Sequence, residues 1–117
     1  MTNIILSVIA ALIMVESQGN PNVKDGDGCD AVGILQEHPI MVEEANRLLG
    51  YEMFTLEDRR NPMLARQIAF TVLSRRMERR DAQRPFTSDL ERIRYMAGLW
   101  NRGEAYKQKV IKEMEKQ

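Results

Sequence analysis

The sequence predicts a mainly α-helical domain in which about five helices pack around one central apolar helix. The central helix is predicted by the run from Ile4 to Val15, twelve residues without a charge that would be buried on most sides. Apolar residues at helical spacing predict the other helices, within residues 39–49, 61–80, 88–100 and 104–114. Residues 22–36, a stretch rich in Gly and Asp, suit a loop or short hairpin.

Length and charge exclude several classes of protein. With 117 residues, the chain is expected to form one domain over residues 1–117. Its 17 basic and 17 acidic residues cancel, so it lacks the positive field by which nucleic-acid-binding and polybasic membrane proteins attract their partners. We therefore expect no nucleic-acid partner, and we expect a monomer.

Cofactors and metal ions are not expected. Cys29 and His38 are the single cysteine and the single histidine, which excludes an internal disulfide and a Cys/His metal cluster. Asp25, Asp27 and Asp30 have a spacing faintly like that of a calcium loop, but the terminal Glu of that pattern is missing. Ordinary turn chemistry also explains these three residues.

The apolar run at the N-terminus is expected to be a core helix. No Lys or Arg precedes it and no small-residue cleavage pattern follows it, so it does not read as a signal peptide. It is also far shorter than the roughly 20 residues needed to span a bilayer, so we expect no stable membrane insertion. Export would then depend on a phage particle, a pore or membership of a larger assembly.

Turn and capping residues predict where the helices begin and end. Residues 19–21 (Gly-Asn-Pro) would end the first helix, and Gly50 would cap the second in a left-handed conformation. Asn61 would cap the third helix, and Ser88 with Glu91 would form a capping box for the fourth. The side chains expected to face inward include Ile40, Leu64, Ile68, Leu73, Leu90 and Ile93.

Glu16 is the first charged residue after the apolar run. A carboxyl that emerges from a buried helix at the wall of a cleft would hold its proton near neutral pH, as a general acid must. Cleavage of a glycosidic bond needs such a donor, because the leaving oxygen must be protonated while positive charge develops at the sugar carbon. Alternatively, Glu16 is only the first polar residue after a core helix.

Three separated segments point together to one family. They are residues 16–21 (ESQGNP), 31–36 (AVGILQ) and 100–103 (WNRG). In this order they resemble the lysozyme-like superfamily, in particular the soluble lytic transglycosylase (SLT) domain and goose-type lysozymes, over about residues 4–106. The resemblance implies a mainly α, lysozyme-like fold of the α+β kind, with Glu16 as the catalytic acid and base.

The resemblance also implies which side chains line the substrate groove. Ser17 and Gln36 stand where groove residues stand in the family, and Asn101 matches the family asparagine. Trp100 stands where transglycosylases usually have tyrosine, which leaves open whether a phenol hydroxyl acts at this position. A place in the core would also explain Trp100, and a place at a helix end would equally explain Ser17.

A second carboxylate would separate two kinds of enzyme. A lytic transglycosylase needs one carboxyl, whereas a hydrolase usually has another that activates water or stabilises the cation. Asp30 precedes Gly-Ile-Leu-Gln much as an Asp does in hen-type lysozymes, although one more residue intervenes here. Asp30 is therefore the preferred candidate for this second carboxylate, and Asp25 and Asp27 are further candidates.

The resemblance implies a muramidase that cleaves the β-1,4 bond between N-acetylmuramic acid and N-acetylglucosamine in the cell wall or periplasm. Peptidoglycan would be its partner, and the source would be a phage or a bacterium. The alternative is a noncatalytic glycan-binding or structural component of a virion or secretion system. A helical protein-interaction module is a third interpretation, which predicts no cleft beside Glu16.

Overall fold

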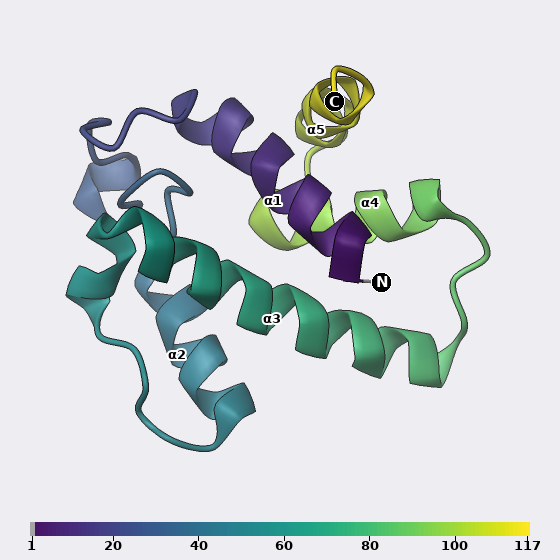
Figure 1. Cartoon of the computed structure of the whole chain (residues 1–117), viewed down its shortest axis with the longest axis horizontal. Helices are drawn as coiled ribbons and strands as arrows, with labels where there is room; N and C mark the ends of the chain where they lie inside the picture. Colours follow the sequence, from purple (N-terminus) through teal and green to yellow (C-terminus); the bar gives the residue numbers. More distant parts are fainter. Residues whose placement is uncertain (1) are drawn as a thin grey trace.

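The computed structural model describes residues 2–117, which form five α-helices and two short 3-10 helices. The mainly helical fold predicted from the sequence is confirmed. In chain order the elements are α1 (Thr2–Ser17), η1 (Asp27–Cys29), α2 (Pro39–Leu49), η2 (Leu56–Arg60), α3 (Pro62–Gln83), α4 (Asp89–Trp100) and α5 (Glu104–Glu115) (Figure 1).

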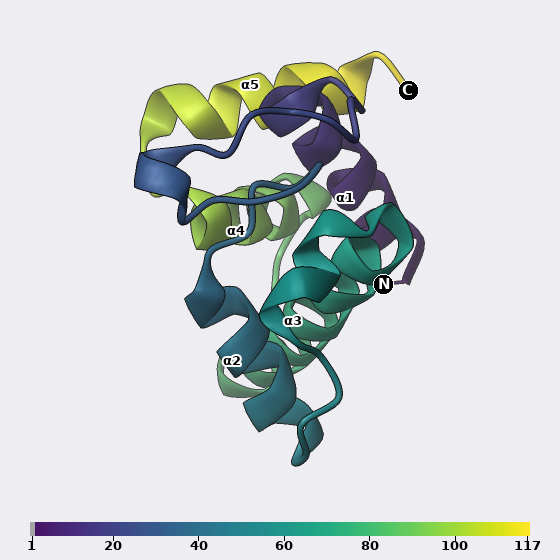
Figure 2. The same ribbon diagram turned by 90° about the vertical axis from the view of Figure 1, so that its left-hand side faces the viewer.

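Helix α1 lies at the centre of the larger hydrophobic core. It contacts α3, α4 and α5, and Figures 1 and 2 show it running between α3 on one side and α5 on the other. Val8 and Leu12 have no exposed surface, whereas Leu6 and Met14 are about half exposed, at 53% and 45%. The helix is thus covered by three other helices and reaches solvent along one narrow face. This burial is expected because a helix that is apolar nearly all round is stable only when most of its surface is removed from water.

Helix α2 belongs to a second, smaller core. Val42 and Ala45 pack there against Ile68 and Val72 of α3, with Phe54 covering one end. Among the described residues α2 contacts α3 and η2 but makes no helix contact with α1. Helix α3 therefore joins the two cores, since its buried residues contribute to both.

The helix ends follow the predicted turn chemistry with few exceptions. Gly50 has φ of 88° and caps α2 through its N–H to the Asn46 carbonyl, and Asn61 caps α3 by accepting the Met63 and Leu64 N–H groups. Ser88 accepts the Glu91 N–H at the start of α4. The Glu91 carboxylate, however, binds Arg80 and Thr87, which leaves the capping box half formed.

Two apolar residues predicted to face inward are exposed. Ile40 is 70% exposed and Leu90 is 53% exposed. Each lies within the first two residues of its helix, before the helix has turned its apolar face onto the core. Helical periodicity places residues within a helix well, but it cannot say where the neighbouring elements begin to cover the helix.

The segment between α1 and α2 is a loop held by two isolated bridges. Gly26 pairs with Ala31 and Val32 pairs with Glu37, both antiparallel, and no longer strand forms in residues 2–117. Of the two alternatives predicted for residues 22–36, a loop or a short hairpin, the structure has the loop, with two tight turns. Residues 27–29 and Gln36 all have positive φ, so much of this loop has left-handed backbone.

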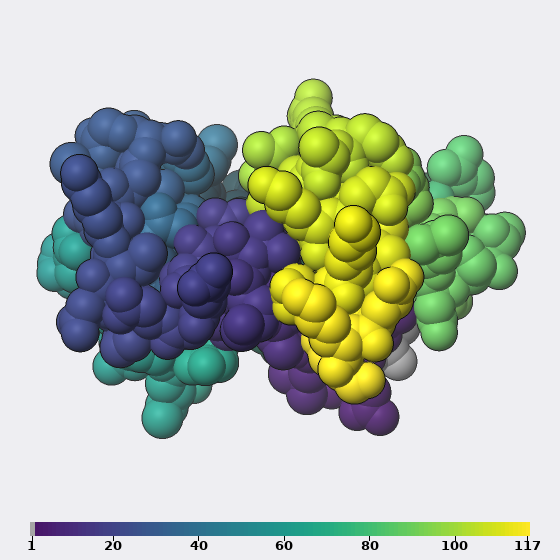
Figure 3. Space-filling model, turned by 90° about the horizontal axis from the view of Figure 1, so that it is seen from above, coloured from purple at the N-terminus to yellow at the C-terminus, as the bar shows by residue number. Residues whose placement is uncertain are grey.

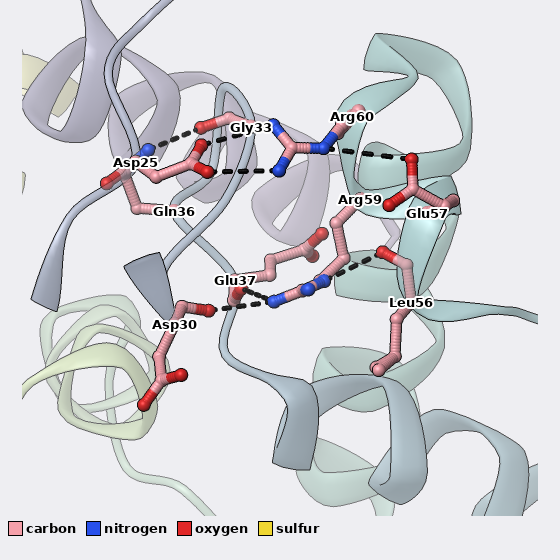
Figure 4. Close-up of polar contacts among 9 residues, drawn as sticks. All are labelled: Asp25, Asp30, Gly33, Gln36, Glu37, Leu56, Glu57, Arg59 and Arg60. Atoms are coloured by element: carbon pink, nitrogen blue, oxygen red, sulfur yellow. Dashed lines mark hydrogen bonds and ion pairs between the residues drawn. The ribbon is translucent and has the colours of Figure 1, made fainter. Parts of the chain in front are cut away.

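Arg59 anchors this loop from inside the protein. Its guanidinium Nη1 donates to the carbonyls of Asp30 at 2.7 Å and Glu37 at 2.9 Å, and its Nε donates to Leu56 at 2.8 Å (Figure 4). These contacts tie the two ends of the second turn to η2. Arg60 adds an exposed, two-point ion pair with Asp25.

Gly33 lets the loop approach η2 closely. It has φ of 82°, and a Cβ at this position would lie 1.9 Å from the Arg59 carbonyl oxygen. The contact is with backbone, which cannot move aside as a flexible side chain would. Gly33 is therefore required for both its conformation and its lack of a side chain.

We expect Gly33→Ala to lower the free energy of unfolding by more than the about 1–2 kcal/mol that left-handed backbone alone costs a non-glycine residue. Gly19→Ala is the matched control, because Gly19 has nearly the same φ of 80° and no atom within 4 Å of the added Cβ. Urea denaturation of both variants measures the difference. Equal losses would contradict a steric role for the Gly33 and Arg59 contact.

Glu37, near the end of the loop between α1 and α2, is buried, and its carboxyl has no hydrogen-bond partner. It is 1% exposed, and neither side-chain oxygen makes a hydrogen bond in the structure. Its side chain runs beside Arg59, while the arginine donates to the Glu37 backbone instead (Figure 4). Burial raises the pKa of Glu37 well above its ordinary value, and the nearby Arg59 charge lowers it by less. Burial of the carboxyl thus favours its neutral form.

Because the pKa of Glu37 is higher in the folded protein, its contribution to stability is complete below about pH 4.5 and is lost as the pH rises towards the folded value. The slope from this group is at most about 1.4 kcal/mol per pH unit. Glu37→Gln removes this titration, so the stability of the variant relative to wild type should rise with pH. Denaturation of both proteins across neutral pH tests this, with exposed Glu43→Gln as control; a difference independent of pH would contradict it.

Candidate active site

A cleft of about 320 Å³ lies between the α1–α2 loop and the junction of α4 and α5. In the space-filling view the surface is hollowed between the blue loop and the yellow-green start of α5, with purple α1 beneath (Figure 3). Glu16 reaches it from α1. Other residues that line the cleft include Gly26, Asp27, Gln36, Glu37, His38, Ile40, Trp100 and Asn101.

Glu16 occupies the last turn of α1 and is half-buried in the cleft wall. It lies on the core side of a helix whose preceding turns are buried, so packing fixes its backbone. One carboxylate oxygen, Oε2, accepts a hydrogen bond from the Tyr106 hydroxyl of α5 at 2.5 Å. This contact joins the wall of the cleft to a helix 90 residues further along the chain.

The surroundings of Glu16 favour a protonated carboxyl. Burial is the largest influence and raises the pKa of Glu16; the Tyr106 hydrogen bond lowers it, and the Asp27 charge raises it again. His38 and Lys109 lower it by less, and the net pKa lies above the ordinary glutamate value. A raised pKa is the property that a general acid needs in order to keep its proton until it meets substrate.

Gln36, for which the sequence predicted a place in the substrate groove, lines this cleft. Its backbone has φ of 48°, and its amide Nε2 donates to the Gly33 carbonyl at 3.0 Å. A Cβ on Gly26 would lie 2.7 Å from the Gln36 Oε1. The Gln36 amide therefore occupies the space that a side chain at position 26 would fill, which is why glycine suits that position.

Trp100 and Asn101 line the opposite wall at the end of α4. The Trp100 indole N–H donates to the Leu35 carbonyl at 2.9 Å, and the ring also packs against the main core. The Asn101 Oδ1 accepts the Gly103 N–H at 2.7 Å. Trp100 thus ties the loop to α4, and it makes a wall of the cleft while belonging to the core.

Ser17 lies outside the set of residues that line the cleft. It is buried, and its hydroxyl oxygen is 2.7 Å from the Ile34 carbonyl and 3.1 Å from the Ile13 carbonyl. It also accepts the Gly19 N–H. These contacts fasten the end of α1 to the loop, so Ser17 helps to position its neighbour Glu16.

Of the three loop aspartates, the structure brings Asp27 to the cleft. Its Oδ2 lies 3.0 Å from the His38 Nε2, and both residues line the same space as Glu16. Asp30, the preferred candidate from the sequence, is exposed and does not line the cleft; its carboxylate points away from Arg59 (Figure 4). Asp25 is paired with Arg60.

Sequence reasoning missed three residues that shape the site. Helical spacing in residues 104–114 predicts only that the Tyr106 ring packs on the core, yet its hydroxyl bonds Glu16. Arg59 sits in a run of charged residues that predicts exposure, and nothing in that run signals its buried contacts. His38 differs from its neighbours in the sequence only as the single histidine, and its place two residues after Gln36 is the one signal that it lies near the cleft.

The described residues contain no group of three or more His, Cys, Asp or Glu side chains arranged to hold a metal ion. Within residues 2–117, no helix combines the length and the apolar character needed to cross a membrane.

Comparison with known proteins gives a family for this site. The family model described as the transglycosylase SLT domain matches residues 1–117. No curated protein and no solved structure gives a significant match. The family generally comprises lytic transglycosylases that act on peptidoglycan. Since the match spans every residue around the cleft, the chain belongs to the transglycosylase SLT domain family.

Proposed function

We propose that this protein is a lytic transglycosylase that cleaves the β-1,4 bond between N-acetylmuramic acid and N-acetylglucosamine in peptidoglycan. Glu16 protonates the leaving oxygen, and its carboxylate then accepts the proton of the muramyl carbon-6 hydroxyl as that oxygen closes an anhydro ring. The half-buried Glu16 with its raised pKa, set in a cleft, carries this proposal. Membership of the SLT family supports it.

The other cleft residues suit a glycan. Gln36 and Asn101 offer amide groups on opposite walls, and the Trp100 ring offers an apolar face beside them. The exposed side chain of Ile40 lies at the same cleft. Sugars present hydroxyl groups and apolar ring faces together, so this mixed lining fits such a substrate.

Replacement of the acid is the direct test. Glu16→Gln keeps an acceptor for the Tyr106 hydroxyl but removes the transferable proton, so release of muropeptides from purified cell walls should fall by at least about 100-fold. The thermal unfolding temperature should stay close to that of wild type, because the variant keeps the volume of the side chain. Glu43→Gln, an exposed change on α2, should retain full activity.

The noncatalytic alternative predicts no release even by wild type. That outcome would leave a glycan-binding or structural component as the better account of the cleft. The third interpretation, a protein-interaction module, predicted no cleft beside Glu16, and it is disfavoured because Glu16 lines one.

If the substrate is peptidoglycan, the protein would act in the cell wall or periplasm, and we propose that it does so as a monomer.

Asp27 raises a second candidate function, hydrolysis. Its carboxylate lines the cleft with Glu16, where it could activate a water molecule. Its side chain is 72% exposed, however, and its Oδ2 already lies 3.0 Å from the His38 Nε2, so it is not free to hold a water molecule against the sugar. We therefore favour the anhydro route, in which one carboxyl is sufficient.

Mass spectrometry of the released muropeptides separates the two routes. We expect anhydro products, and we expect Asp27→Asn to change the rate by no more than about threefold, since its effect on Glu16 is an electrostatic one across partly hydrated space. Reducing-end products that disappear in Asp27→Asn would instead identify a hydrolase with Asp27 as its second carboxylate. The exposed change Asp89→Asn serves as control.

A further inference from the structure

A second pocket, of about 620 Å³, lies between the C-terminal half of α3 and helix α4. The residues that line it are Arg76, Arg79, Arg80, Ala82, Gln83 and Tyr95. Three guanidinium groups, an amide and a phenol hydroxyl thus surround one space, and none of the described residues that line it is acidic. A lining so rich in hydrogen-bond donors suits an anion, since guanidinium groups bind carboxylates with strong, charge-assisted hydrogen bonds.

The ion pairs beside this pocket leave it with positive charge. The Nε of Arg76 lies 2.8 Å from the Glu44 carboxylate, which Arg47 also binds, at 2.8 Å. One negative charge therefore serves two arginines. Arg79 is exposed, and no carboxylate pairs with it within residues 2–117. The pocket thus has guanidinium groups that are not neutralised by the protein itself.

Arg80 and Tyr95 shape the pocket from its two helices. The Arg80 Nη2 donates to Glu91 at 2.9 Å, and its guanidinium lies 4.3 Å from the centre of the Phe86 ring. Tyr95 packs on the same ring, and its hydroxyl makes no hydrogen bond to any other residue in the part of the chain that the structure describes. Arg80 is thus committed to structure, whereas the Tyr95 hydroxyl and Arg79 are free to bind a ligand.

The pocket lies along the same groove as the cleft that holds Glu16. Among the described residues α2 and α4 both contact α3 but not each other, and Figure 2 shows α4 above α2 with α3 beside them. Ile40 of α2 and Leu99 of α4 line the cleft. Glu44 and Tyr95 lie one turn further along the same helix faces, about 6 Å away, and border the arginines. The arginine-lined pocket is thus within reach of a substrate bound at Glu16.

The dipole of α3 does not explain these arginines. A helix dipole favours cations near the C-terminus, but its effect falls off within the last turn. Arg80 is the basic residue in the last turn of α3, whereas Arg76 and Arg79 precede it. Arg75 is an exposed neighbour on the same helix, yet it does not line the pocket. What distinguishes Arg76 and Arg79 is the space that they face.

We propose that this pocket binds a carboxylate of the peptide that peptidoglycan carries on its muramyl sugars, so that the enzyme prefers glycan strands that still carry their peptides. The inference rests on the proposed function, because it names a further part of the substrate of the same site. The peptide is joined to the lactyl group of the muramyl sugar and has free carboxylates. Three or four extended residues span roughly 10–14 Å, which is more than the one helical turn between the cleft and the pocket.

Kinetics on two substrates tests the inference, namely peptide-bearing cell walls and glycan strands from which an amidase has removed the peptides. Arg79→Gln should lower kcat/KM about fivefold on the peptide-bearing walls, mainly through KM, because a partly exposed, charge-assisted contact is lost. It should leave cleavage of the peptide-free strands unchanged. Arg75→Gln is the matched control, since it removes the same charge from the same helix outside the pocket, and it should change neither rate. Equal losses on the two substrates, or equal losses in the two variants, would overturn the inference.

Binding can also be measured apart from cleavage. NMR titration with N-acetylmuramyl tetrapeptide, and with the same compound after its carboxylates are amidated, should show about fivefold tighter binding of the charged form. Arg79→Gln should abolish this difference and Arg75→Gln should keep it. Equal affinity of wild type for the two compounds would overturn the inference even where the enzyme cleaves cell walls. The expected preference without cleavage of either polymer by wild type would overturn the proposed function and leave the carboxylate pocket standing.

Discussion

The burial of one carboxyl group at the end of α1 is the constraint on which the site depends. Helix α1 has no charge before Glu16 and packs against three other helices, so Glu16 is brought to the cleft at the edge of a dry core. Water is partly withdrawn from the carboxyl, and its pKa rises for that reason before any other. The Tyr106 bond lowers the pKa again by a smaller amount, so the surroundings favour the protonated carboxyl while the bond also stabilises its charged form.

The opposite wall of the cleft depends on a loop that has almost no regular structure. Its position is fixed by contacts with residues distant in the sequence: Arg59 holds two of its carbonyls, Ser17 holds a third, and Trp100 holds a fourth. Gly33 allows the closest approach. These hydrogen bonds to four carbonyls from distant parts of the chain hold a short loop of largely left-handed backbone in a fixed position beside the cleft.

Much of this arrangement could be predicted from the sequence because it follows from local rules. The uncharged run of α1, the caps at Gly50 and Asn61, and the order of the ESQGNP, AVGILQ and WNRG segments gave the helices, the family and Gln36, Trp100 and Asn101 at the cleft. The predictions that differed from the structure involve geometry that a single sequence does not encode. Asp27 and Asp30 are both turn residues by composition, and the backbone conformation of residues 27–29 decides which of them faces Glu16. Arg59 and Tyr106 act across long separations in sequence, which no local pattern records.

The central claim is that proton transfer by Glu16 drives cleavage of peptidoglycan. The alkaline limb of kcat/KM reports the pKa of the essential acid in the free enzyme, so it is to be compared with the NMR titration of the Glu16 carboxyl carbon in the same protein and buffer. The account predicts that the two midpoints coincide, above the ordinary glutamate value. Cleavage whose alkaline limb does not follow the Glu16 titration would contradict it.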